Sequence, residues 1–389
     1  MKASYQGLEL RGMRVLVRED LNVPLRDGAI SDDTRVRAAV GTLDDLSRRG
    51  ARVVVMSHLG RPRGRVVPEL SLRPVAARLA ELLGRPVGFA EDCVGPAAGQ
   101  AVERMSEGDV VLLENVRFHS GDEANDPEFA RDLAALGDVY VNDAFAASHR
   151  AHASVVGVAQ HLPAYAGLLM LAELDALHRA LDEPRRPLVA IVGGAKVSTK
   201  AGVLRYLLPR VDELLVGGAM ANTFFKAQGR EVGASYVEDA ALDTAREVER
   251  DGGGKLLLPV DAVCARAMEP GQETSIRPVD AVEPGWMILD VGPATTERFG
   301  GRLRGAGTVV WNGPVGVFEI PEFAGGTRAL GEAVADSGAY SLVGGGDTAA
   351  AVDQLGLAGR FSHVSTGGGA TLEYMEGREL PGVAVLRDA

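Results

Sequence analysis

Short apolar runs rich in β-branched residues alternate along the chain with longer stretches whose apolar residues recur at helical spacing. In the first half the runs predict four strands, and the stretches between them predict three helices. The strands are Arg14–Val17, Val53–Met56, Val110–Leu113 and Val139–Asn142, and the helices are Thr34–Arg48, Leu72–Leu83 and Pro127–Ala135. This alternation is typical of βα units around a parallel sheet.

A second series of the same kind predicts a second sheet. Its strands are expected at Leu188–Val192, Glu213–Val216, Leu256–Val260, Met287–Asp290, Val309–Trp311 and Ser341–Val343, and its helices at Val203–Val211 and Thr327–Asp336. Between the two series, Leu168–Leu181 has helical spacing and leads into Asp-Glu-Pro-Arg-Arg-Pro, which cannot continue a helix. We therefore expect an α/β protein of two doubly wound, Rossmann-like domains, 1–167 and 183–371, joined by a connector helix over 168–182.

Length, charge and cysteine content narrow the class of protein. A chain of 389 residues with 46% hydrophobic side chains is long enough for two cores, and its net charge of −12 argues against a nucleic-acid or anionic-membrane partner. No apolar run approaches the roughly 20 residues that span a bilayer, and the N-terminus lacks a signal-peptide core, so we expect a cytoplasmic protein. Cys93 and Cys264 have no metal-binding spacing, and the sequence predicts neither a disulfide framework nor a structural zinc site.

Basic and polar residues follow the predicted strands of the first half. Because ligands of open parallel sheets bind at the carboxyl ends of the strands, these residues are candidates for a site. Each alone is about as well explained as a solvated surface residue, but together, in an acidic protein, they favour a small anionic substrate. They are Arg18, Asp20, Asn22, Arg35, His58, Arg61, Arg117, His119, His149, Arg150 and His152.

Two glycine runs in the second half predict phosphate binding. Val343–Ala351 reads Val-Gly-Gly-Gly-Asp-Thr-Ala-Ala-Ala, and Ser365–Ala370 reads Ser-Thr-Gly-Gly-Gly-Ala. A triple glycine that follows a strand and opens a helix lets backbone N–H groups converge on phosphate oxygens. Two such runs indicate a polyphosphate ligand, and Asp347 inside the first run is placed to hold the accompanying magnesium.

A further glycine run, Gly193–Lys200, follows the strand predicted at Leu188–Val192. Its two lysines, Lys196 and Lys200, are four residues apart and are expected on one face of a helix, where they would lie along a phosphate chain. The run is not a Walker A loop, and a lysine pair on a helix is more often solvated surface. This run alone is therefore a weak signal.

Nine motifs in order resemble the motif series of the phosphoglycerate kinase family. Each motif is modest alone, but nine at the family's spacing, over essentially the whole chain, are highly specific. They are Val17–Pro24, Ser57–Arg61, Leu113–Phe118, Asn142–Phe145, His149–His152, Gly193–Lys200, Trp311–Glu319, Gly344–Thr348 and Ser365–Gly369. Residues 372–389 also resemble the family's tail, which returns to complete the N-terminal domain.

The resemblance implies reversible transfer of a phosphoryl group from 1,3-bisphosphoglycerate to MgADP, giving 3-phosphoglycerate and MgATP in glycolysis. It implies a monomer with a deep interdomain cleft, in which the N-terminal domain binds the glycerate. There, Asp20 and Asn22 would hold the glycerate hydroxyl and its surroundings, and Arg35 would reach the reacting carboxyl end. The distal 3-phosphate would be held by His58, Arg61, Arg117 and Arg150.

The resemblance also implies a nucleotide site in the C-terminal domain. Lys196 and Lys200 would lie along the phosphates, Glu319 would bind the ribose, and Asp347 would bind Mg²⁺. The adenine slot and phosphate cradles would be formed by Gly194, Ala195, Gly217, Gly218, Leu289, Asn312, Pro314, Gly345, Gly346, Thr348 and Gly368. Arg35, Lys196, Lys200 and the amides at Gly345 and Gly368 would be catalytic.

The chemistry is consistent with this inventory. The phosphoryl acceptor is a phosphate oxygen of ADP in one direction and a carboxylate in the other, and both are ionised at neutral pH. No general base is needed, so positive charge and backbone dipoles around a loose transition state suffice, once closure of the domains brings the substrates together.

Two other classes of protein remain open at this point. A nicotinamide-dependent dehydrogenase is suggested by the paired α/β domains and by Gly344-x-Gly346-x-x-Ala349, which formally fits a dinucleotide fingerprint. No acidic ribose partner follows at the expected distance. A non-catalytic sensor of phosphorylated metabolites would use the same scaffold, although it should have lost some of the transfer residues.

Overall fold

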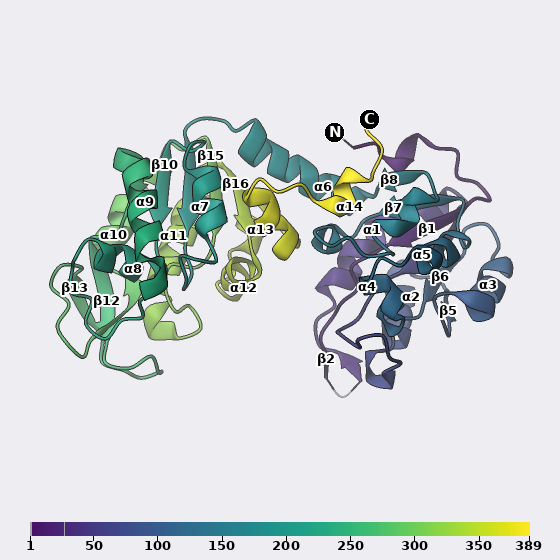
Figure 1. Ribbon diagram of the computed structural model, residues 1–389, viewed down its shortest axis with the longest axis horizontal. Coiled ribbons are helices and arrows are strands. Elements are labelled where there is room, and N and C mark those ends of the chain that lie inside the picture. Colours follow the sequence, from purple (N-terminus) through teal and green to yellow (C-terminus); the bar gives the residue numbers. More distant parts are fainter. Residues whose placement is uncertain (1, 27) are drawn as a thin grey trace. The chain divides into compact units, whose positions relative to one another are not determined.

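The structure, a computed structural model, describes residues 2–26 and 28–389. The chain divides into two units, Met1–Leu174 with Glu379–Ala389, and Asp175–Arg378 (Figure 1). Each unit is an α/β layer structure around its own parallel sheet, which confirms the expected fold class. The division assigns no separate connector, so the expected limits 1–167, 168–182, 183–371 and 372–389 stay a prediction.

The sheet of the first unit has six parallel strands in the order β5-β6-β4-β1-β7-β8. The four predicted strands are its centre, and the two that the sequence did not reveal are its edges, where runs are short and only partly buried. The strands are β1 (Arg14–Arg18), β4 (Arg52–Met56), β5 (Val87–Ala90), β6 (Val110–Leu113), β7 (Val139–Asn142) and β8 (Ala164–Ala166), and β2 (Leu25–Arg26) and β3 (Ala29–Ile30) form a separate hairpin.

Helices cover both faces of this sheet (Figure 1). In α1 the side chains of Val36, Ala39, Leu43 and Leu46 recur every three or four residues and are buried against the strands, which is the spacing that predicted the helix. The helices are α1 (Thr34–Arg48), α2 (Arg73–Leu83), α3 (Gly95–Glu103), α4 (Ser120–Glu123), α5 (Pro127–Ala134) and α14 (Pro381–Ala384).

The last residues of the chain pack into the first unit. The Nδ2 of Asn142, at the end of β7, donates to the Gly382 carbonyl at 2.9 Å, and the Gly382 N–H donates to the Ser148 carbonyl at 2.8 Å. A Cβ on Gly382 would lie 2.6 Å from Val155 Cγ1, so the tail approaches too closely for a side chain at this position.

The main sheet of the second unit also has six parallel strands, in the order β11-β10-β9-β15-β16-β17. A second, antiparallel sheet has the order β13-β12-β14. The strands are β9 (Leu188–Val192), β10 (Glu213–Val216), β11 (Leu256–Leu257), β12 (Asp261–Ala265), β13 (Ser275–Pro278), β14 (Met287–Val291), β15 (Thr308–Asn312), β16 (Tyr340–Gly344) and β17 (His363–Val364).

Two predicted strands of this unit differ in the structure. Met287–Asp290 belongs to β14 of the antiparallel sheet rather than to the parallel sheet. The strand expected over Leu256–Val260 ends at Leu257. Beyond it, the backbone N–H groups of Val260 and Asp261 donate to Thr295 Oγ1 at 3.0 and 3.1 Å, so these groups do not continue the ladder.

Helices flank the parallel sheet of the second unit (Figure 1). They are α7 (Ala201–Leu207), α8 (Met220–Ala227), α9 (Leu242–Gly252), α10 (Pro293–Leu303), α11 (Gly325–Asp336), α12 (Gly346–Gln354) and α13 (Gly369–Met375). The segment predicted as helical over Leu168–Leu181 is α6 (Leu168–Leu177) followed by one wider π turn, His178–Asp182.

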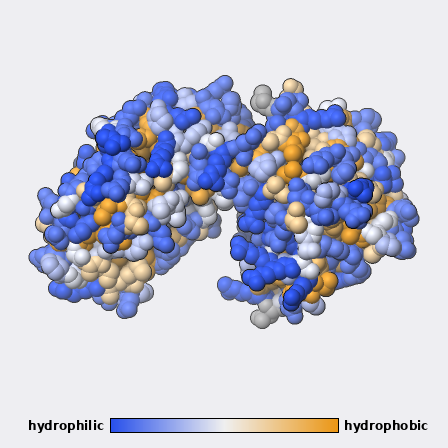
Figure 2. Space-filling model, viewed as in Figure 1, coloured by the Kyte–Doolittle hydropathy of each residue, from blue (hydrophilic) through white to orange (hydrophobic). Residues whose placement is uncertain are grey.

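The face of the molecule in Figure 2 is mainly hydrophilic. Within residues 2–26 and 28–389, no helix has both the length and the apolar character needed to cross a membrane. Five large hydrophobic side chains are exposed among the described residues, and two of them, Tyr236 and Met268, line a cavity of the second unit.

Candidate functional site

A buried cluster of positive charge lies at the carboxyl edge of the first sheet. β1 and β4 are neighbours, so the residues that end them meet there. Arg18 is fully buried, and its guanidinium donates to Ser154 Oγ at 3.1 Å and to the Glu19 carbonyl, and contacts His58 Nδ1 at 3.0 Å. None of these three partners carries a counter-charge.

The Arg18 contact fixes the tautomer of His58. A guanidinium can only donate, so Nδ1 of His58 accepts and the ring proton lies on Nε2. Burial, together with the charges of Arg18 and Arg117, holds the pKa of His58 well below its usual range. His58 is therefore neutral at physiological pH, donates a hydrogen bond from Nε2 and is only a weak base.

Arg117 comes from the turn that follows β6, Val116–Phe118. Its guanidinium is almost fully buried, and it donates from Nη1 to the Gly60 carbonyl at 2.9 Å. Burial, reinforced by the nearby charge of Arg18, lowers the pKa of Arg117, while Glu123 at 3.6 Å opposes this shift. Its Nε has no hydrogen-bond partner among the described residues, and a buried donor of this kind is costly unless a ligand satisfies it.

Asp20, Asn22 and Arg35 form a second group at the same edge. Arg35, in the first turn of α1, donates from Nη1 to Asp20 Oδ2 at 2.6 Å, and its side chain is 39% exposed. The side-chain oxygen of Asn22 accepts the Gly60 N–H at 2.9 Å. These contacts fix Asp20 and Asn22 and leave Arg35 accessible.

Two predicted residues are less firmly placed. Arg150 is half-buried, and its Nε donates to His149 Nε2 at 3.1 Å; its charge contributes to the lowered pKa of Arg117, so the two guanidinium groups are neighbours. Arg61 is exposed and makes no hydrogen bond or ion pair with the other described residues. The structure brings together Arg35, His58, Arg117 and Arg150, while Arg61 stands apart.

The sequence placed Arg18 among the candidates for an anionic substrate, but the family resemblance assigned it no individual role. Its burial became visible only in the structure, as did that of Asp122, which accepts the Ser154 N–H at 3.0 Å and lies 3.6 Å from His152 Nδ1. A charged residue that directly ends an apolar strand was the available signal for Arg18.

A cavity of about 840 Å³ opens in the second unit. Its walls are mostly apolar, and such a lining with a few polar groups is typical of a small-molecule site. Among the predicted nucleotide residues, seven line it: Gly194, Ala195, Gly218, Leu289, Pro314, Glu319 and Asp347.

Glycines allow three loops to meet at one end of the cavity. A Cβ on Gly193 would lie 2.1 Å from the Pro314 carbonyl oxygen, and one on Gly218 would lie 2.6 Å from the Gly194 carbonyl oxygen. Gly217 is similarly close to Val315. The loops after β9, β10 and β15 therefore pack closely, against backbone at Gly193 and Gly218 and against the Val315 side chain at Gly217, which explains why these positions carry no side chain.

Lys200 is tied to the start of α12 through Asn312. Its Nζ donates to Asn312 Oδ1, and Asn312 Nδ2 donates to the Gly344 carbonyl at 2.8 Å. Burial lowers the pKa of Lys200, and the carboxylates of Asp347 and Glu376 oppose this effect. Lys200 thus lies near Asp347, as expected for groups that share a phosphate chain.

The prediction that Lys196 and Lys200 share a helix face is wrong. α7 begins at Ala201, and the preceding residues form a turn in which the Lys200 N–H donates to the Val197 carbonyl at 3.0 Å. Thr199 Oγ1 donates to the Lys196 carbonyl at 2.9 Å, and such local side-chain bonds compete with helix formation. Lys196 is exposed, whereas Lys200 is partly buried.

The glycine run after β16 opens α12. Gly345 has φ 94° and precedes the first helical residue, Gly346, and the Thr348 hydroxyl accepts the Gly313 N–H at 2.6 Å. Gly368 has φ 50° and precedes α13. Asp347 is exposed in the first turn of α12, where its carboxylate offers the hard oxygen ligand that Mg²⁺ prefers in combination with substrate phosphates.

Asp290 is a functional candidate that the sequence did not single out. It lines the cavity, is nearly fully buried, and accepts the Gly326 and Val291 N–H groups at 2.6 and 2.9 Å. Burial raises its pKa to about 7. The only sequence signal was an acidic residue near the end of an apolar strand.

Comparison with known proteins gives one consistent family. The family model for phosphoglycerate kinase matches residues 5–378. A phosphoglycerate kinase of Rubrobacter xylanophilus is 56% identical over 385 residues, 99% of this chain and 98% of the relative.

Solved structures agree. Phosphoglycerate kinase from Coxiella burnetii has 45% identity and a TM-score of 0.92, and the enzyme from Pyrococcus horikoshii has 33% identity and a TM-score of 0.86. In both cases the match covers 99% of this chain and 98% of the other.

Proposed function

The chain belongs to the phosphoglycerate kinase family, and we propose that its two units divide the two substrates of that reaction between them. It is a phosphotransferase with a carboxyl group as acceptor, and it binds small-molecule substrates. In the proposal, the first unit binds 3-phosphoglycerate or 1,3-bisphosphoglycerate and the second binds ADP or ATP. The dehydrogenase alternative is wrong, because the whole chain matches a kinase family.

The buried cluster of Arg18, His58 and Arg117 is the main support for the proposal that the first unit binds the phosphoglycerate. Two guanidinium groups and a neutral imidazole gather there, with Asp122 and Glu123 as neighbouring acidic groups, and Arg117 Nε lacks a hydrogen-bond partner among the described residues. A phosphate dianion would satisfy these donors, and the low dielectric would strengthen the contact. We assign the 3-phosphate to this cluster, with Arg150 beside Arg117. Arg61, which stands apart, would have to move its exposed side chain to reach the phosphate.

The contact with Asp20 supports a different role for Arg35. Its guanidinium is more accessible than that of Arg117, and it starts from another element, α1. Asp20 and Asn22, both held by hydrogen bonds, would orient the glycerate, and Arg35 would stabilise charge at its carboxyl end.

The nucleotide half of the proposal rests on the cavity and the two glycine runs. The apolar walls near Leu289 suit a purine, and Glu319 at the same cavity suits a ribose. Lys200, the N–H groups that open α12, and the amide at Gly368 would surround the phosphates. Asp347 would hold Mg²⁺, which screens the charge of the phosphate chain. Lys196, exposed on its turn, would have to reach the phosphates by bending its flexible stem.

In the proposal, side chains of the protein stabilise the transition state, and none of them accepts a proton. Both acceptor oxygens are already ionised, so no base is required, and the lowered pKa of His58 makes it a weak one. Arg35 and Lys200 would neutralise charge on the migrating phosphoryl group, after closure of the units excludes water. As part of the same proposal, the enzyme acts as a cytoplasmic monomer.

A coupled assay for ATP formation from 1,3-bisphosphoglycerate and MgADP tests the activity directly. For the glycerate site, Arg117→Leu is expected to weaken 3-phosphoglycerate binding about 30-fold or more in calorimetry, since it removes a buried charged donor. Arg131→Leu, an exposed arginine of the same unit, is the control and should bind normally. Normal binding by Arg117→Leu would remove this cluster as the phosphate site.

A further inference from the structure

Three side chains with metal-binding chemistry gather at the carboxyl edge of the first sheet, and none of them is among the substrate residues assigned above. Asp92 and Cys93 follow β5, and His119 follows the turn after β6. β5 and β6 are adjacent parallel strands, so the loops after them meet. One donor atom from each residue lies within 4.8 Å of the others.

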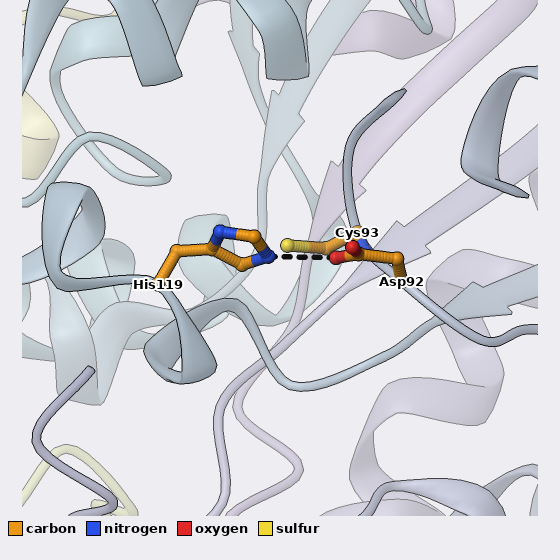
Figure 3. A group of neighbouring side chains, drawn as sticks. All are labelled: Asp92, Cys93 and His119. Atoms are coloured by element: carbon orange, nitrogen blue, oxygen red, sulfur yellow. Dashed lines mark hydrogen bonds and ion pairs between the residues drawn. The ribbon is translucent and has the colours of Figure 1, made fainter. Parts of the chain in front are cut away.

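The geometry of the group is convergent. His119 Nε2 and Asp92 Oδ1 are 2.7 Å apart, and Figure 3 shows the Cys93 sulfur pointing toward the same edge of the imidazole ring. The ring is held in this orientation by stacking on Phe129, with centroids 5.2 Å apart. Three different donor atoms therefore face one small volume.

Solvent reaches this volume from the side of His119 and Asp92. Cys93 is fully buried, whereas the side chains of His119 and Asp92 are 35% and 44% exposed. The sulfur is therefore on the buried side of the group, and the imidazole and carboxylate are on its solvent-facing side. An ion from solvent would reach the exposed pair first and the sulfur next.

We propose that Asp92, Cys93 and His119 bind one zinc ion, with water as the fourth ligand. Thiolate, imidazole and carboxylate are the zinc ligands of proteins, and in a tetrahedral site they lie about 3.5 Å from one another. The present spacings, from 2.7 Å to at most 4.8 Å, bracket that value, so small side-chain movements suffice. Binding releases the thiol proton to solvent. The imidazole proton, which now lies on Nε2 facing Asp92, is exchanged through solvent to Nδ1, so that the Nε2 lone pair is free to bind the ion.

The donor set also selects against magnesium. Mg²⁺ demands oxygen ligands and has little affinity for a thiolate, whereas Zn²⁺ accepts all three donors. The site is thus chemically distinct from the carboxylate Asp347 and independent of the proposed function. The sequence gave no zinc spacing because 25 residues separate Cys93 from His119, and only the pairing of β5 with β6 joins them.

The test uses the full-length protein, freed of metal with a chelator and kept reduced, in excess Mg²⁺ so that carboxylate sites are occupied. Zn²⁺ is titrated by calorimetry, and Co²⁺ serves as a spectroscopic probe whose thiolate charge-transfer band reports a sulfur ligand. We expect one high-affinity Zn²⁺ per chain and a Co²⁺ thiolate band. Cys93→Ser should abolish the band and weaken Zn²⁺ binding by at least about tenfold.

Matched variants separate this site from adventitious binding. Cys264→Ser changes the other buried cysteine and should leave both signals intact, as should His178→Gln, which alters an exposed histidine paired with Asp182. If Cys93→Ser does not fold, His119→Gln and Asp92→Asn must weaken Zn²⁺ binding instead. Absence of stoichiometric Zn²⁺ binding in the unaltered protein, or a thiolate band that survives without Cys93, would overturn the proposal.

Discussion

The position of Arg35 predicts that it contributes more to turnover than to substrate binding. It starts from α1, outside the buried cluster, and among the described residues its side chain pairs with the Asp20 carboxylate alone. We predict that Arg35→Ala lowers kcat by about 100-fold or more while 3-phosphoglycerate binding weakens far less, because its charge acts on the transition state. Steady-state kinetics and calorimetry measure the two effects.

The control for Arg35 is Arg37→Ala, two residues along the same helix, where the side chain pairs with Asp33 and is 59% exposed. This variant should retain both kcat and binding. Preserved turnover in Arg35→Ala, with the whole loss in substrate binding, would contradict the catalytic role.

Asp290 should make the second unit less stable as pH rises. In the folded unit the pKa of Asp290 is about 7, above the value in the unfolded chain, so the folded state holds the carboxyl proton more tightly. The stabilisation of the folded state that results is fully present below about pH 4. We predict that the free energy of unfolding falls by on the order of a few kcal/mol between about pH 4 and pH 7 and then levels. Asp290→Asn should flatten this part of the profile.

Tryptophan fluorescence can measure this change in the second unit. Both of its tryptophans, Trp286 and Trp311, belong to the second unit, so tryptophan fluorescence during denaturant unfolding reports on that unit alone. Asp280→Asn, at an exposed position of the same unit, is the control and should keep the parent slope. An unchanged pH profile in Asp290→Asn would show that its carboxyl group titrates normally.

At the scale of single residues, the sequence indicated which residue types matter but not their environment. The arginines and glycines stood out by position after strands and by motif. The buried partnership of Arg18 with His58, and the burial that shifts Asp290, depend on side chains far apart in the sequence. Tertiary packing decides these properties, so local patterns cannot reveal them.

At the scale of elements, α12 is expected to act through its first turn. Asp347 lies there, exposed, with Lys200 nearby. We predict that Asp347→Ala raises the Mg²⁺ concentration for half-maximal activity by at least about tenfold, because an oxygen ligand is lost. Titration of Mg²⁺ at fixed nucleotide measures this.

Asp353→Ala, an exposed carboxylate near the other end of α12, controls for the loss of negative charge. It should leave the Mg²⁺ requirement unchanged. If the two variants respond alike, Asp347 is not a magnesium ligand.

Elements with strong local signals were predictable and elements defined by distant partners were not. The central strands of both sheets are rich in β-branched residues and buried on both faces, so they stand out in the sequence as continuous apolar runs. Met287–Asp290 reads like any other short apolar run, and only its pairing with β12 assigns it to the antiparallel sheet. The turn before α7 likewise contains one local hydroxyl hydrogen bond, from Thr199 to the Lys196 carbonyl, which competes with the helix that the spacing predicts.

At the scale of the whole molecule, the proposed division of the substrates between two units requires both units to contribute to one reaction. The proposed phosphate cluster belongs to the first unit, and Lys200 with the glycine runs belongs to the second. Phosphoryl transfer needs the two reacting oxygens in line and shielded from water, and neither unit holds both substrates in the proposal. Binding of both substrates should therefore favour a closed arrangement over the ligand-free ensemble.

Small-angle scattering tests this closure. We predict that the radius of gyration falls when 3-phosphoglycerate and a non-transferable MgATP analogue are both bound, and falls less with either ligand alone, because only the pair bridges the units. Arg117→Leu, which should lose glycerate binding, is expected to compact no more than the nucleotide complex does. A radius of gyration that stays constant at concentrations where calorimetry shows both sites filled would contradict the predicted closure of the units.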